Sequence, residues 1–115
     1  MENLIYSIKQ DKDAVVVLFQ GKFSAKEIPI LEKMITELEG KKQRHIIFDF
    51  RRVSSCLTYA AFHKILKSYR GANKVVALTS LKPEIKMMMV REGGARESEI
   101  YGSIPEALGS VSAKP

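Results

Sequence analysis

Hydrophobic and polar positions organise the chain around residues 45–69. Residues 46–50 are β-branched or aromatic except for one aspartate, a pattern typical of a strand that is covered on both faces of a sheet. Further on, apolar residues recur at the spacing of one helix face: Phe62, Ile65, Leu66 and Tyr69. We therefore predict a central strand, a loop at Ser54 and Ser55, and an amphipathic helix that is capped by Thr58.

The pattern before this segment predicts a β-hairpin. Residues 4–9 alternate between two faces, and residues 14–19 are apolar throughout. The charged stretch between them suits a turn, and Gly21 is expected to end the second strand.

A first helix should follow the hairpin, with a buried stripe formed by Leu31, Met34, Ile35 and Leu38. Gly40 is placed to end this helix. Ser24 and Glu27 have the spacing of a capping box, but Pro29 would then remove a hydrogen bond inside the helix. We therefore expect the helix to begin a few residues later.

After the central segment, the pattern predicts a strand, a helix, a short strand and a last helix. Residues 74–79 are another continuous apolar run, so this strand should also be interior. The third helix opens near Pro83 and ends at the glycines 93–94, with an apolar face of Ile85, Met88 and Met89. Residues 99–101 can form the short strand, and a capping-box pattern at residues 103–106 begins the last helix.

The predicted order of elements is two strands, a helix and then three strand–helix pairs. Three details accompany this order: the Asp-x-x-x-Val spacing of residues 49–53, a glycine after the second strand, and a Ser-x-x-Glu-Ala-Leu start of the last helix. The arrangement resembles the STAS domain, the fold of anti-sigma factor antagonists. The resemblance and the pattern together imply a single α/β domain, with a mixed sheet of about five strands and about four helices mainly on one face.

Length and composition limit the classes of protein that the chain can be. The 115 residues suffice for one domain, which we assign to residues 1–111, followed by a flexible tail at residues 112–115. A single cysteine excludes an internal disulfide and a multi-cysteine metal site. No segment resembles a signal peptide, and the longest apolar runs are far below the roughly 18 residues of a membrane span. We expect a soluble cytoplasmic protein without membrane insertion.

The net charge of +6 is concentrated in the middle of the sequence. Residues 41–91 contain twelve basic and two acidic residues, whereas both flanks are slightly acidic. The bases are spread over several elements without an aromatic-interleaved motif, so we disfavour nucleic acid as a partner. Lys64, Lys67 and Arg70 advance along the polar side of the second helix. We predict an uncompensated positive face there that docks on an acidic protein surface.

Phosphorylation cannot be carried over from the family. Its phosphorylatable members have Asp-Ser-Ser-Gly before the second helix, and a partner kinase phosphorylates the second serine. An ungapped alignment places residues 57–60 there, and a one-residue shift that matches the helix stripe puts Ala60 at the phosphoserine position. Neither alignment supplies a serine. Thr58 is then the candidate phosphoacceptor, because a phosphate there would meet a helix N-terminus. The alternative, which we favour, is that Thr58 is an ordinary helix cap.

Catalytic chemistry has little support in the sequence. Cys56 lies in an apolar context that is typical of a small buried side chain. His45 and His63 are too far apart in the sequence for a local metal motif, and no phosphate-binding loop or nucleophile-elbow motif is present. Met87 is the one methionine of the third helix that falls outside its apolar face. We expect no enzymatic activity, no metal and no cofactor.

Protein binding is therefore the predicted function. The resemblance implies docking on an anti-sigma factor or kinase through the surface around residues 54–70. We assign the partner-binding residues as Ser55, Thr58, Tyr59, His63, Lys64, Lys67 and Arg70. The alternative is a regulatory or structural subunit of an ABC-type membrane transport ATPase. Binding of a small molecule or nucleotide is a third class, and whether the protein forms a homodimer stays open.

Overall fold

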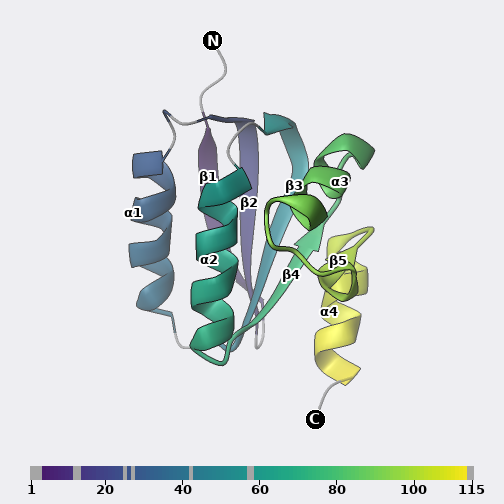
Figure 1. The fold of residues 1–115 in the computed structure, drawn as a ribbon. Coiled ribbons are helices and arrows are strands. Elements are labelled where there is room, and N and C mark those ends of the chain that lie inside the picture. Colours follow the sequence, from purple (N-terminus) through teal and green to yellow (C-terminus); the bar gives the residue numbers. More distant parts are fainter. Residues whose placement is uncertain are drawn as a thin grey trace.

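A computed structural model describes residues 4–11, 14–24, 26, 28–41, 43–56 and 59–113 of the chain (Figure 1). Their order of elements is the predicted one, with one added 3-10 turn, η2. The elements are β1 (Ile5–Asp11), β2 (Ala14–Phe23), α1 (Ile28–Glu39), β3 (His45–Cys56), α2 (Tyr59–Gly71), β4 (Val75–Thr79), α3 (Pro83–Arg91), η2 (Glu97–Glu99), β5 (Ile100–Tyr101) and α4 (Ile104–Ala113).

The five strands form one mixed sheet in the order β1-β2-β3-β4-β5, so β3 is the central strand, as predicted. β1 and β2 are the antiparallel hairpin that the alternation indicated. The pairs β2–β3, β3–β4 and β4–β5 are parallel, and a helix connects the two strands of each pair. A parallel pair needs such a crossover because the second strand must start again at the same end of the sheet.

The sheet is covered on both faces, but unequally. α1, α2 and α3 pack on one face over the larger core, which contains the predicted stripes of α1 and α2. α4 packs on the other face over a smaller core of Val16, Ile47, Ala77 and Ala107. Alternate residues of β3 enter the two cores, which explains why the whole run from Ile46 to Phe50 is buried.

Two predicted strand ends are wrong, and one pairing explains both. β2 continues past Gly21 to Phe23, and β3 continues through Ser54 and Ser55 to Cys56. Gly21 has a φ of 105° at an irregularity in the β2–β3 register, a backbone geometry that glycine adopts without strain. After it, Phe23 pairs with Cys56, and both side chains are buried. The predicted loop at Ser54 and Ser55 is therefore strand.

The helix boundaries follow the predicted signals more closely. α1 begins at Ile28 with Pro29 in its first turn, later than a capping box at Ser24 would require. Glu27 of that box lies outside the described residues. At the start of α4, the Glu106 amide donates to Ser103 Oγ at 3.4 Å, and the Glu106 carboxylate accepts from the Gly102 amide at 2.9 Å. In α3, Met89 is buried and Met87 is 54% exposed, while Met88, which we assigned to the apolar face, is only half-buried.

Candidate docking surface

The surface predicted for partner binding lies where β3 leads into α2. A buried polar pair fixes the strands beneath it: Thr79 Oγ1 donates to Asp49 Oδ1 at 3.0 Å, with both residues almost fully buried. The Arg51 amide also donates to Asp49 Oδ1, at 3.4 Å. The aspartate of the Asp-x-x-x-Val pattern therefore joins β3 to β4 inside the sheet rather than contributing to the surface.

α2 presents the polar face that the sequence predicted. His63, Lys64 and Lys67 are exposed, and Ser55 and Tyr59 are half-buried at the β3–α2 junction. Thr58, the candidate phosphoacceptor and cap, lies outside the described residues. The opposite face of α2 is the buried stripe, so core and surface are cleanly separated along this helix.

The side of α2 that faces α1 is hollowed. Ala60, Lys64 and Ser68 line a groove of about 460 Å³ together with Ile28 and Ile35 from α1. Most of its lining is apolar, and Glu32 contributes a carboxylate. A groove of this size beside exposed lysines can receive apolar side chains of a partner while the lysines meet its acidic groups.

The other side of α2 is engaged within the protein. Arg70 forms an ion pair with Glu99, in which its Nε donates to Glu99 Oε2 at 3.0 Å, and it also donates to the Gly94 carbonyl at 2.8 Å. His63 lies against Gly94, since a Cβ atom built there would come within 2.8 Å of the His63 ring. The predicted uncompensated positive face is therefore wrong at Arg70. Lys64 and Lys67 have no ion pair within the described part of the chain.

At the start of α2, Tyr59 is linked to Cys56. Burial, then the neighbouring Cys56 thiol with which it shares a hydrogen bond, raises the pKa of Tyr59 to about 12. The hydroxyl is therefore neutral at physiological pH. Cys56 is 5% exposed, the buried small side chain that its context predicted.

Two groups of residues at this surface had no usable signal in the sequence. Ile28 and Ile35 were recognised only as helix residues, yet they form one wall of the groove. Glu99 is 29 residues from Arg70 in the chain, and no local spacing connects them. Within the described residues, no three His, Cys, Asp or Glu side chains are grouped closely enough to hold a metal ion. In the same part of the chain, no helix is both long and apolar enough to cross a membrane.

Comparison with solved structures finds the same fold several times. A putative anti-sigma factor antagonist from Thermotoga maritima has a TM-score of 0.80 at 22% identity, covering 93% of this chain and 94% of its own. An anti-sigma factor antagonist from Mycobacterium paratuberculosis has a TM-score of 0.79 at 16% identity, covering 96% and 95%. A sulfate transporter family protein from Wolinella succinogenes has a TM-score of 0.75 at 16% identity, covering 90% and 88%.

At these identities the likeness concerns the fold. No curated protein has a significantly similar sequence. The sequence profile of the STAS domain matches residues 6–107, which is most of the chain. The resemblance noted in the order of elements is thereby confirmed, and the chain belongs to the STAS domain family.

Proposed function

We propose that this STAS protein is a non-enzymatic, cytoplasmic partner-switching protein of the anti-sigma factor antagonist type, which docks through α2. The observation that carries the proposal is the pairing of two exposed lysines, Lys64 and Lys67, with the mostly apolar groove between α1 and α2. Charged groups beside an apolar recess are what a transient protein interface needs: the charges speed association, and the recess supplies buried contact area. Its partner is an anti-sigma factor or kinase with an acidic docking surface.

Switching, where it occurs, is proposed to act on Thr58. This residue directly precedes α2, and a phosphate there would lie near the positive end of the helix dipole. The same phosphate would add negative charge next to the lysine-bearing face and so weaken docking on an acidic partner. Phosphopeptide mapping after incubation with cell extract and ATP tests the site. Phosphate on Ser54 or Ser55 alone would contradict it.

The experiment for the docking surface is a charge reversal with a matched control. Lys64→Glu combined with Lys67→Glu should slow association with the captured native partner by on the order of tenfold at low salt, because electrostatic steering is reversed. Lys86→Glu combined with Arg91→Glu makes the same charge change on exposed positions of α3 and should leave the rate near that of the parent. Equal rates for both double variants would reject α2 as the docking surface.

The identity of the captured partner separates this proposal from its alternative. A STAS subunit of an ABC-type transport ATPase is the second candidate, which the structural likeness to the sulfate transporter family protein supports. Affinity capture from native cells, with the Lys64/Lys67 double reversal as the negative control, should recover a histidine-kinase-like anti-sigma factor under the first proposal. Recovery of a transporter nucleotide-binding subunit would favour the second.

A further inference from the structure

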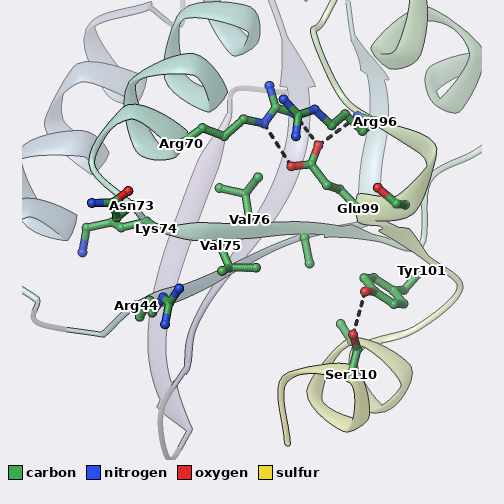
Figure 2. Close-up of a pocket in the computed structure, with 13 residues that line it drawn as sticks. Arg44, Arg70, Asn73, Lys74, Val75, Val76, Arg96, Glu99, Tyr101 and Ser110 are labelled. Atoms are coloured by element: carbon green, nitrogen blue, oxygen red, sulfur yellow. Dashed lines mark hydrogen bonds and ion pairs between the residues drawn. The ribbon is translucent and has the colours of Figure 1, made fainter. Parts of the chain in front are cut away.

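Half of one sheet edge is open. β5 contains two residues, and they pair only with Leu78 and Thr79 of β4. In the described part of the chain, no strand therefore lies beside residues 75–77 on this side of β4. Figure 2 shows this stretch of β4 crossing the centre of a pocket. An unpaired edge of this kind is a template for strand addition unless the protein blocks it.

The backbone of this stretch is oriented to accept a strand. The Val75 amide donates to the Arg44 carbonyl at 2.8 Å, so the polar groups of Val75 point toward β3. In a parallel strand, successive residues direct these groups to opposite edges. The N–H and C=O of Val76 therefore point to the open edge. Ser80, which is in phase with Val76, follows the same alternation, since its amide donates to the Tyr101 carbonyl at 3.3 Å on that side.

The pocket at this edge is strongly positive. Its volume is about 510 Å³, and among the described residues that line it are four cations and a single carboxylate: Arg44, Arg70, Lys74, Arg96 and Glu99. Glu99 is already paired with Arg70, and Lys74 Nζ donates to the Gln43 carbonyl at 2.9 Å. The side chains of Arg44 and Arg96 are exposed. The pocket therefore has a positive charge that its own carboxylate does not balance.

The cations flank both faces of the open edge. In Figure 2, Arg70 and Arg96 lie on the same side of β4 as Val76, and Arg44 lies on the other side with Val75. Side chains of an added strand would alternate between these two sides. Consecutive acidic residues in such a strand would thus meet Arg96 on one face and Arg44 on the other.

We propose that the open edge of β4 binds an extended acidic segment of a partner protein as an added strand. Main-chain hydrogen bonds to Val76 would give the segment its register, and the arginines on the two faces would select consecutive acidic side chains. This interface is separate from the α2 surface and goes beyond the proposed function. It would give the protein a second contact, which can hold a partner while the α2 surface is engaged or released.

A designed peptide tests the proposal without knowledge of the partner. The probe is fluorescein-labelled Thr-Val-Glu-Glu-Val-Thr with a blocked C-terminus, and its binding is followed by fluorescence anisotropy at low salt. One control peptide has Gln in place of both Glu residues, and another carries backbone N-methyl groups that prevent strand pairing. We expect at least about tenfold weaker binding of each control, because each lacks one of the two recognition elements. The amide of Val76 should exchange with solvent more slowly in the complex with the parent peptide.

Charge reversal at the edge supplies the matching protein variants. Arg44→Glu with Arg96→Glu should weaken binding of the acidic peptide about tenfold or more, whereas Lys64→Glu with Lys67→Glu should leave it unchanged. Because the last pair is the docking variant of the proposed function, the two interfaces succeed or fail independently. The strand-addition proposal is overturned if the N-methylated peptide binds like the parent, if Val76 exchange does not change at saturation, or if an oligothymidylate of equal charge protects Val76 equally well.

Discussion

At the level of single residues, two buried hydroxyl groups differ in whether they have a partner. Thr79 donates to Asp49, and both belong to the buried part of the sheet. The Tyr69 hydroxyl is also buried, but it has no hydrogen-bond partner in the described part of the chain. A satisfied buried group stabilises the fold modestly, while an unsatisfied one leaves its desolvation penalty uncompensated. Removing the two hydroxyls should therefore change stability in opposite directions.

Thr79→Val is expected to lower the free energy of unfolding by about 1–3 kcal/mol, because the Asp49 carboxylate loses its buried donor while the shape of the site is kept. Urea unfolding measures the change. Thr36→Val is the control: its hydroxyl is exposed and donates only to the Glu32 carbonyl of the same helix, so the effect should stay within about 0.5 kcal/mol. Equal effects of the two substitutions would mean that the Asp49–Thr79 pair adds nothing.

Tyr69→Phe is expected to raise the free energy of unfolding by about 1 kcal/mol at pH 7, since it removes a buried hydroxyl without a partner. Tyr101→Phe should instead lower it by about 1 kcal/mol, because the Tyr101 hydroxyl is 2.8 Å from Ser110 Oγ and shares a hydrogen bond with it. Urea unfolding of both variants gives the comparison. Loss of stability in Tyr69→Phe at pH 7 would show that its hydroxyl is satisfied.

Tyr69 should also contribute to loss of stability in alkali. Burial, then the Glu39 carboxylate, raises the pKa of Tyr69 to about 12, against about 10 in the unfolded chain. Between these values the unfolded state loses the proton and the folded state keeps it, so stability falls as the pH rises from about 10 to about 12. Tyr69→Phe should reduce the slope of stability against pH in this window and leave it unchanged below pH 9. An identical slope in both proteins would exclude Tyr69 as a cause.

At the level of elements, the link between α2 and the segment after α3 depends on one glycine. Gly94 has a φ of 74°, a conformation that costs a residue with a side chain about 1–2 kcal/mol. A Cβ there would also meet the His63 ring at 2.8 Å. Backbone conformation and helix contact thus both require glycine at this position.

Gly94→Ala is expected to destabilise the protein by roughly 2–3 kcal/mol, the sum of backbone strain and steric overlap. In a His63→Ala background, the same substitution should cost only the strain, because the ring is gone. A double-mutant cycle by urea unfolding measures the difference. Gly71→Ala is the control, since its Cβ would meet nothing within 4 Å. Strict additivity of the two changes would contradict the contact between His63 and Gly94.

The elements themselves could be predicted because their signals are local. The apolar stripe of α2 and the continuous run of β3 are periodic patterns within one segment. The end of β3 could not be predicted, since the two serines become strand only by pairing with the residues after Gly21 in β2. The same applies to the candidate site: Lys64 was found from helix periodicity, whereas the partner of Arg70 is Glu99, which a different turn supplies. Contacts between distant segments leave no spacing to detect.

At the level of the whole molecule, α2 combines the centre of the core with the docking surface. The Phe62 ring lies within 5.2–5.9 Å of four other phenylalanine rings, which belong to β2 and β3: Phe19, Phe23, Phe48 and Phe50. Aromatic packing of this kind contributes beyond the buried area alone. Figure 1 shows α2 lying across the middle of the sheet, so this cluster fixes the helix to the central strands. The exposed lysines are on the same helix and face solvent.

The last prediction is that stability and docking can be changed independently along α2. Phe62→Leu should lower the free energy of unfolding by about 1–3 kcal/mol, because it loses ring contacts in a fully packed core. Most of the protein should still be folded, since domains of this size have about 5–15 kcal/mol of stability. The association rate with the native partner, measured well below the unfolding midpoint, should then equal that of the parent. The Lys64/Lys67 double reversal should do the opposite, slowing association while the midpoint barely moves. If folded Phe62→Leu also docks slowly, then the docking surface depends on how the phenylalanine cluster positions α2, and charge alone does not account for binding.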